Sequence, residues 1–297
     1  MSGVVSSIIT NSAAMVGVET LNSINTALNS VQNQISTGYS VSSAVDNGAA
    51  FAVAQSVRTN ISGLTAANQQ LGDTQGLLST TNTALTNISN LMQSMDSTLV
   101  NLSSSSISDS QKSQYAAQFT SQLKNLQFYI QGAGYNGQTL IGSSSGTLKT
   151  SSATFTSSAL HVSLDANGNT ISITANSLGS VYSALSTIGA SLAKVASGTY
   201  SYATVANFLT ATGSFSKQVS SVGSYLNTYG NLTNQIDAQI TYNQNKMDAL
   251  SNGLGALVDA NMAAESAKLQ SLQIQQQLAT SALSIANQQP SILTKLI

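Results

Sequence analysis

An unbroken seven-residue repeat in the first third of the chain most constrains what the chain can fold into. Its members are Leu64, Leu71, Leu78, Leu85, Met92 and Leu99, with Ile88, Met95 and Leu102 three residues after the last three of them. Five consecutive intervals of this spacing are typical of a helix that packs one apolar stripe along a partner helix. At about 1.5 Å per residue, such a helix is about 55 Å long. We predict that this stripe lines an intramolecular core rather than a contact between molecules.

The surface of such a helix is unusually poor in charge. Charged residues are 6% of the 297 residues, whereas soluble domains typically contain about 25%. Nine basic and ten acidic residues give a net charge of −1, and Arg58 is the first basic residue after the amino terminus. Nucleic acids and anionic membranes both require clustered Lys and Arg. The sequence therefore indicates neither a nucleic-acid partner nor a membrane partner.

Further segments show helical periodicity. The spacing predicts helices over residues 15–35, 109–131, 202–250 and 250–285, with helical periodicity returning near Val181. Gly38 suits a helix C-terminus, and Asp46-Asn47-Gly48 suits a turn before the next helix. Within the 202–250 segment, Gly213, Gly223 and Gly230 weaken the helical pattern.

The middle of the chain lacks helical periodicity and instead contains short segments with strand-like patterns. Short β-like pieces at 154–158, 160–164 and 171–173, with a turn at Asn167-Gly168, predict a hairpin. The expected fold class is therefore mainly α: a long antiparallel helical coiled-coil rod formed by both chain ends, with a small β-hairpin insertion at the outer tip.

The chain contains little catalytic chemistry. It has no cysteine, so it has no disulfide and no thiolate metal site. His161 is the only histidine, and its alternation with Leu160 and Val162 predicts a solvent-facing strand residue. There is no HExxH motif and no phosphate-binding loop. We therefore expect no enzyme activity, no cofactor and no metal. The serine clusters at 103–110 and 143–158 are interpreted as polar loops, with surface O-glycosylation as a secondary interpretation.

The opening residues carry no recognisable leader. MSGVVSSIITNSAAM lacks the basic and continuous apolar regions of a secretory signal, and no run approaches the roughly 18 apolar residues of a membrane span. If the protein leaves the cell, we expect another export route.

Both terminal segments are amphipathic but lack neighbours that would complete a bundle. Between Lys268 and Lys295 the chain carries no charge, yet apolar residues recur at helical spacing among Gln, Ser and Asn. A buried amide both donates and accepts hydrogen bonds, whereas a buried charge is costly unless it is paired. We expect these stripes to be covered by other molecules.

Two long motifs resemble a known family. Residues 255–297 read GALVDANMAAESAKLQSLQIQQQLATSALSIANQQPSILTKLI, which closely resembles the carboxyl-terminal signature of bacterial flagellins, especially the short alphaproteobacterial kind. Residues 28–64 read LNSVQNQISTGYSVSSAVDNGAAFAVAQSVRTNISGL and resemble the flagellin segment that enters the helical rod. Tyr135-Asn136-Gly137 is similar to the family's aromatic-Asn-Gly turn.

The resemblance implies a structural subunit of the extracellular flagellar filament. It implies that residues 1–44 and 262–297 form a terminal coiled coil lining the inner tube, that 45–142 and 181–261 form the tube wall, and that 143–180 form a variable outer insertion. It also implies self-association, export unfolded through the flagellar type III apparatus, and contact with cap and hook-filament junction proteins.

The expected self-assembly interface combines terminal apolar residues with polar turn residues. It consists of Leu21, Leu28, Ile35, Asp46, Gly48, Asp259, Leu269, Leu272, Leu278, Leu283, Ile285 and Asn287. For Asp46 and Asp259, capping and contact between subunits remain open alternatives.

Two other functions are weighed against a filament subunit. A hook-filament junction protein would share the terminal helices, although the last helix fits it less well. A secreted helical adhesin would require the Ser/Thr-rich middle to bind a ligand.

Overall fold

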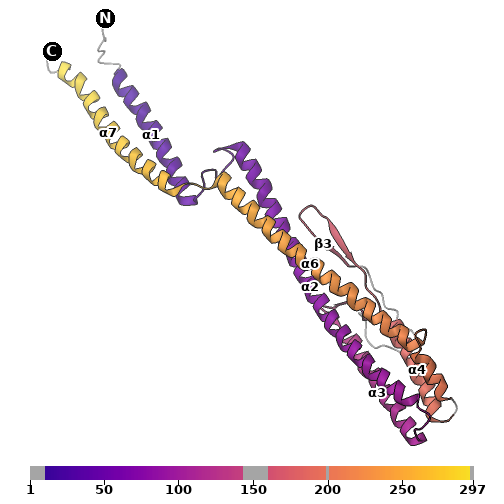
Figure 1. Cartoon of the computed structure of the whole chain (residues 1–297). Helices are drawn as coiled ribbons and strands as arrows, with labels where there is room; N and C mark the ends of the chain where they lie inside the picture. Colours follow the sequence, from indigo (N-terminus) through magenta and orange to yellow (C-terminus); the bar gives the residue numbers. More distant parts are fainter. Residues whose placement is uncertain (1–10, 143–159, 199–200, 295–297) are drawn as a thin grey trace. The chain divides into compact units, whose positions relative to one another are not determined.

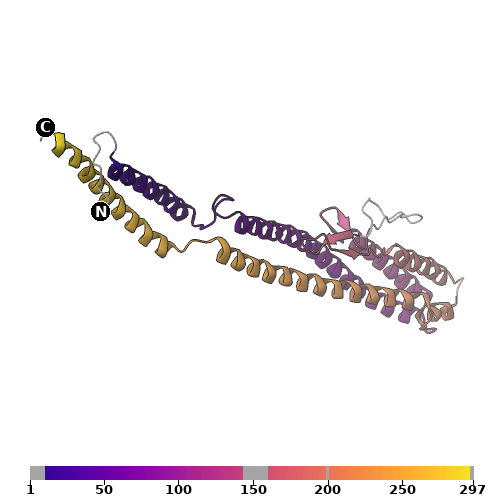
Figure 2. The same ribbon diagram turned by 90° about the horizontal axis from the view of Figure 1, so that it is seen from above.

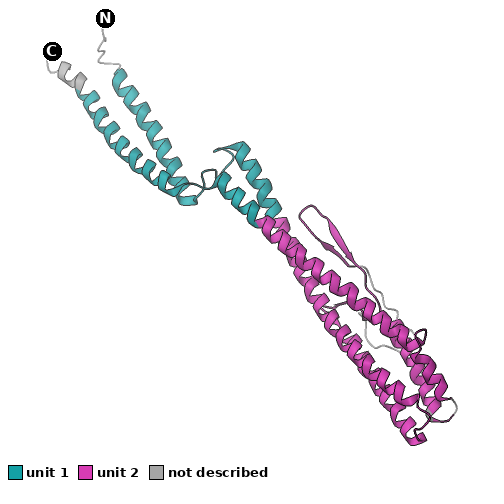
Figure 3. Ribbon diagram, in the orientation of Figure 1, with its two compact units in different colours: residues 1–61, 248–297 teal, residues 62–247 magenta. Residues whose placement is uncertain are grey.

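The computed structural model describes residues 11–142, 160–198 and 201–294. The chain divides into two compact units: residues 1–61 with 248–297 form unit 1, and residues 62–247 form unit 2 (Figure 3). The helices are α1 (Ser12–Thr37), α2 (Gly48–Leu102), α3 (Asp109–Gln131), α4 (Gly179–Ala196), α5 (Tyr202–Leu209), α6 (Ser214–Val258) and α7 (Met262–Thr294). The β-like piece predicted at 154–158 and the serine cluster at 143–158 lie outside the described residues.

Unit 1 pairs the first helix of the chain with the last one. Figures 1 and 2 show α1 and α7 side by side from two directions. Asn11 lies level with Ala286 and Asn25 lies level with Gln276, so the two helices are antiparallel. Asn11 caps α1, and Gly38 ends it in the left-handed conformation at φ 75°, as the sequence predicted.

The two connections beyond this pair bind one another through backbone hydrogen bonds. Ser40 N donates to Val258 O at 2.7 Å, and Ala260 N donates to Gly38 O at 2.8 Å. These bonds interrupt the helical pattern that the sequence continues from Leu250 to Ile285. Helix α6 ends at Val258, and α7 starts after Asn261, whose side chain accepts from the first amides of the helix.

Unit 2 is built around the seven-residue repeat of α2. All six repeat members, from Leu64 to Leu99, are at most 1% exposed. From Leu71 onward they lie in one core with apolar residues of α3, α4 and α6. The predicted intramolecular stripe is confirmed.

Helix α4 completes this core by close approach to α3. It buries Val181, Leu185, Ile188, Leu192 and Val195 at helical spacing. Gly189 lies on the same helix, and a Cβ there would stand 2.8 Å from Leu123 Cδ1. A larger side chain at Gly189 would require the Leu123 side chain to move.

The long helix predicted from Tyr202 to Leu250 is interrupted once. Helix α5 ends at Leu209 and α6 begins at Ser214. A Cβ at Gly213 would lie 2.3 Å from Phe208 O, so this turn requires glycine. Gly223 and Gly230 lie within the continuous helix α6.

Two small antiparallel hairpins complete unit 2. Strands β1 (Gly134–Tyr135) and β2 (Gln138–Thr139) are joined through Asn136 and Gly137, both at positive φ, as a tight two-residue turn requires. Strands β3 (Leu160–Ser163) and β4 (Thr170–Ile173) pair with Leu160 opposite Ile173. The predicted hairpin is confirmed.

Polar side chains of α6 hold the β3–β4 hairpin along the helices. Asn243, fully buried, donates to Leu164 O at 2.8 Å and to Asn68 Oδ1 at 2.9 Å. Tyr229, also fully buried, donates from its hydroxyl to Leu140 O or Thr174 O and accepts from Asn176 N. Desolvation raises the pKa of Tyr229, so its hydroxyl stays a donor.

The fold class is confirmed as mainly α, with long helices at both chain ends. The β3–β4 hairpin lies along α6, where the buried Asn243 donates to Leu164 O, directly after β3.

Candidate functional site

The α1/α7 pair of unit 1 has a narrow apolar seam. Ile24, Leu28 and Val31 of α1 are buried against Leu272 of α7. Leu269, Ala279, Ala27 and Ile35 pack against them at partial exposure. Across the pair, Gly17 allows close contact with Leu283, whose Cδ1 would lie 3.1 Å from an added Cβ. Leu272 is therefore the one buried side chain that α7 contributes to the seam among the described residues.

Uncharged amides link the two helices beside this seam. Gln276 Nε2 donates to Asn25 Oδ1 at 2.7 Å, and Asn11 Nδ2 donates to Ala286 O at 2.9 Å. These bonds join the helices without desolvating an ion, in agreement with the glutamine-rich and asparagine-rich composition of the segment.

Large apolar side chains remain uncovered on the same pair. Ile274, Leu278 and Ile285 of α7 are 58%, 64% and 65% exposed, and Met15, Val16 and Val18 of α1 are exposed as well. Two grooves run between the helices. We call them the first groove, which Met15, Val16, Val18 and Leu283 line, and the second groove, which Val16, Leu278, Ala279 and Ala282 line. Large contiguous patches of exposed apolar surface are typical of contact sites in soluble proteins.

The structure separates the predicted interface residues into four groups. Leu28 and Leu272 are buried within the α1/α7 pair, while Leu21, Ile35, Leu269 and Leu283 are half-buried. Leu278, Ile285 and Asn287 are exposed on α7. Asp46, Gly48 and Asp259 are exposed at the connections between helices.

Each polar turn residue has a defined local role. The Asp46 carboxylate accepts from the backbone amides of Ser42 and Ser43 at 3.0 and 2.9 Å. Asn47, rather than Asp46, caps α2 by accepting from Ala50 N. Asp259 pairs with Tyr39 through the backbone, in an isolated antiparallel bridge.

We expect the Asp46 turn to loosen in acid. Hydrogen bonds from Ser43 and Ser42 lower the pKa of Asp46. A carboxyl whose pKa is lowered by folding contributes stability above its unfolded pKa and loses that contribution as the pH falls through the folded pKa. An NMR titration of Asp46 should give a midpoint below the ordinary value of about 3.9. Asp46→Asn should reduce the exchange protection of the Ser42 and Ser43 amides at pH 7, because a neutral amide oxygen accepts hydrogen bonds more weakly than a carboxylate does.

The matched control for this turn is Asp248→Asn, an exposed position in the same unit. It should leave both amides protected. A midpoint for Asp46 at or above the ordinary value would show that the turn does not bind the carboxylate.

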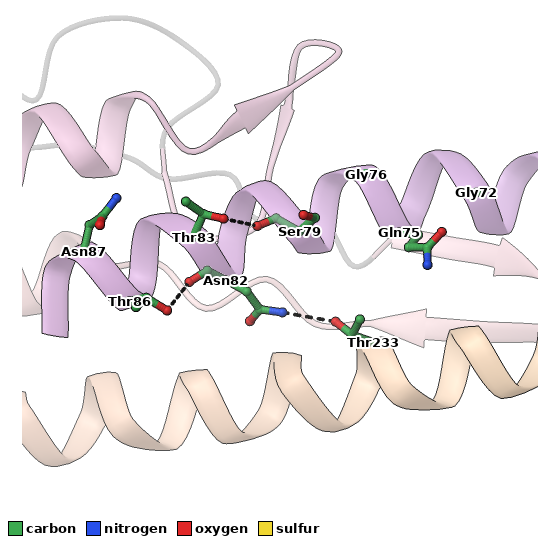
Figure 4. A pocket seen from close by; sticks show the side chains of 9 residues that line it. All are labelled: Gly72, Gln75, Gly76, Ser79, Asn82, Thr83, Thr86, Asn87 and Thr233. Carbon is green, nitrogen blue, oxygen red and sulfur yellow. Dashed lines mark hydrogen bonds between the residues drawn. The ribbon is translucent and has the colours of Figure 1, made fainter. Parts of the chain in front are cut away.

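Unit 2 carries an open groove without charged side chains in its lining (Figure 4). The lining residues are Gly72, Gln75, Gly76, Ser79, Asn82, Thr83, Thr86 and Asn87 of α2, with Thr233 of α6. Thr83 and Thr86 bond back to carbonyls of their own helix, and Asn82 Nδ2 donates to Thr233 Oγ1 at 3.1 Å. The groove presents small, hydrogen-bonded groups and no acid, base or nucleophile pair.

The histidine of the chain, His161, lines a smaller pocket with Asp73 and Tyr135. His161 is exposed on β3, as its alternation predicted. Within residues 11–142, 160–198 and 201–294, no three acidic or histidine side chains gather into a metal site. None of the helices in these ranges combines the length and hydropathy needed to cross a membrane.

Comparison with known proteins decides what this arrangement belongs to. Residues 8–146 match the bacterial flagellin N-terminal helical region, and residues 209–297 match the bacterial flagellin C-terminal helical region. The chain belongs to the flagellin family. It is 30% identical to flagellin FljM of Caulobacter vibrioides over 290 residues, which cover 98% of both chains. It is 30% identical to a flagellin of Brucella melitensis over 95% of both chains, and 28% identical to flagellin C of Rhizobium meliloti over 95% of this chain and 96% of that protein.

Membership in this family establishes the broad function. Flagellin is a structural protein that polymerises with itself into the flagellar filament, and this chain is such a filament subunit. The matches over nearly the whole chain favour neither a hook-filament junction protein nor an adhesin.

Several residues of the exposed surface had escaped the sequence analysis. Ile274 carries its apolar side chain outward, as Leu278 does, and Met15 and Val16 line the first groove. Glu19 lies among them as a single acid. Helical spacing alone could have identified the apolar residues. It could not have identified Glu19, because a single acid among exposed residues follows no periodic pattern.

Proposed function

We propose that the α1/α7 pair is the element through which this flagellin subunit joins its neighbours in the filament. The single observation that carries this proposal is the exposed apolar surface of the pair, centred on Ile274, Leu278 and Ile285. Each leucine or isoleucine contributes about 1.5 to 3 kcal/mol when fully buried. Covering this surface with other subunits adds apolar burial to α7 that the seam with α1 does not provide.

The proposed interface includes the residues that the sequence singled out. Leu21, Leu28, Ile35, Leu269 and Leu272 hold the pair together and shape its surface. Leu278, Leu283, Ile285 and Asn287 contact neighbouring subunits, and the exposed Asp46, Gly48 and Asp259 add polar contacts between subunits.

We assign three parts to the subunit within the filament. Residues 1–44 and 262–297 form the inner coiled coil, residues 45–142 and 181–261 form the wall, and residues 143–180 form the outer insertion. The charge-poor α1/α7 surface supports the inner position, because amides tolerate both water and packed neighbours.

The wider context of the subunit follows from its family. We infer that it works outside the cell without catalysis, and that it is exported by the flagellar type III apparatus. It then contacts the cap and the hook-filament junction proteins, and O-glycans decorate its exposed serines. A chain without cysteine supports export in an unfolded state, since nothing crosslinks it.

Elongation of filament seeds tests the proposal. Purified subunits added to sonicated filaments should lengthen them, as seen by negative-stain electron microscopy, and a chain truncated before Met262 should not. Seeds that elongate equally with the truncated chain would refute an assembly role for α7.

A further inference from the structure

Glu19 is the one charged residue that lines the two grooves of the α1/α7 pair. It borders both of them, while the other lining residues are apolar, small or neutral. Met15, Val16 and Leu278 around it are all more than 60% exposed. Any surface that covers these side chains also takes Glu19 out of water, and a carboxylate covered without a partner is strongly unfavourable.

Unit 1 of a second copy offers one exposed cation to this acid among its described residues. Unit 1 has two basic residues within its described part, Arg58 and Lys268. Arg58 is half-buried and lies 5.7 Å from the centre of the Tyr39 ring. Lys268 is 57% exposed and forms a loose ion pair with Glu265 of its own helix, with 3.8 Å between its Nζ and Glu265 Oε2. Lys268 is therefore the cation of unit 1 that is placed to reach another molecule.

The register of the pair gives the offset between two such copies. Asn25 lies level with Gln276, so Lys268, eight residues earlier on α7, lies level with Asn33 of α1. Asn33 is fourteen residues beyond Glu19, or about 21 Å along the helix. Copies related by translation along the pair, as in a head-to-tail polymer, bring Lys268 of one copy to Glu19 of the next at this offset.

We propose that Glu19 of one subunit forms an ion pair with Lys268 of a neighbouring subunit and sets the offset between their α1/α7 pairs. The inference rests on the proposed assembly role of this surface and names the contact that fixes its register. An ion pair within an otherwise apolar contact favours one alignment, because a shifted alignment covers Glu19 without a cation.

A charge-swap series tests this pair. Glu19→Lys and Lys268→Glu should each raise the critical concentration for seed elongation at least about tenfold, since each places like charges together. In the double variant E19K/K268E, the logarithm of the critical concentration should return at least about halfway from the single-variant value to the wild-type value. The control variant E19K/K217E has the same net charge as E19K/K268E, but its second substitution changes an exposed lysine of unit 2. It should elongate seeds as poorly as E19K does.

Three outcomes would refute the proposed ion pair between Glu19 and Lys268. They are normal elongation of E19K, no restoration in E19K/K268E, and equal restoration by E19K/K217E. Circular dichroism of each soluble subunit should match that of the wild type, since both residues are exposed. Failure of wild-type subunits to elongate seeds would instead refute the proposed assembly role itself.

Discussion

Leu278→Asp abolishes filament growth while leaving the subunit folded. The Leu278 side chain is 64% exposed in the subunit, so the α1/α7 seam does not depend on it. In the filament, the substitution loses about 1.5 to 3 kcal/mol of apolar burial and adds the cost of covering a carboxylate, which is several kcal/mol. At about 1.4 kcal/mol per factor of ten, the critical concentration rises at least about 100-fold. Sedimentation of seeded reactions measures this concentration.

Two variants identify the cause of this loss. Gln277→Asp introduces the same charge at the neighbouring exposed position, which does not line the second groove, and it should change the critical concentration less than about tenfold. Leu272→Asp changes a residue buried in the seam and should also separate α1 from α7 in the free subunit. If Gln277→Asp blocks growth as completely as Leu278→Asp, charge rather than apolar contact controls assembly.

Leu85→Ala destabilises unit 2 by about 2 to 5 kcal/mol, because it removes buried methyl groups and leaves a cavity. Leu85 is 0% exposed and lies in the core that α2 shares with α3, α4 and α6. Urea unfolding of the subunit, followed by circular dichroism, measures the change in the free energy of unfolding.

The matched control for Leu85 is Thr83→Ala on the exposed face of α2. Thr83 bonds only to the Ser79 carbonyl of its own helix, so the control should change the free energy of unfolding by less than about 0.5 kcal/mol. A loss below about 1 kcal/mol for Leu85→Ala would contradict a core role and would assign the repeat to contacts between subunits.

The helices with strong local signals could be predicted closely from sequence. Helix α3 has the predicted bounds, because Ser108 and Gln111 form a reciprocal cap at its start and Gly132 follows its end. The seven-residue repeat of α2 was assigned to the core correctly, since a stripe of that length is stable only against a partner.

Breaks caused by distant contacts could not be predicted. Leu254, Val258 and Met262 continue the helical spacing across the end of α6, and the chain breaks there because Gly38 and Ser40 bind its backbone. Gly213, Gly223 and Gly230 look alike in sequence, but only Gly213 faces a carbonyl too close for a side chain.

The candidate site was predictable as a stripe but not as a surface. Leu272 and Leu278 belong to the same periodic pattern, yet the first faces α1 and the second faces outward. That difference depends on the register between α1 and α7. The register is set by the apolar seam and by a hydrogen bond between amides that lie more than 250 positions apart in the sequence. Glu19 carries no local signal, because its significance comes from the exposed side chains around it.

Hydrogen exchange on subunits and filaments tests most directly whether neighbouring subunits cover the α1/α7 pair. In the free subunit, amides of α1 and α7 should exchange at least about 100-fold faster than those of α2 between Leu71 and Leu99, since the narrow seam opens more readily than the unit 2 core. In the filament, the α1 and α7 amides should slow to the rates of that core. Full protection of α1 and α7 in the free subunit, unchanged on assembly, would contradict the account.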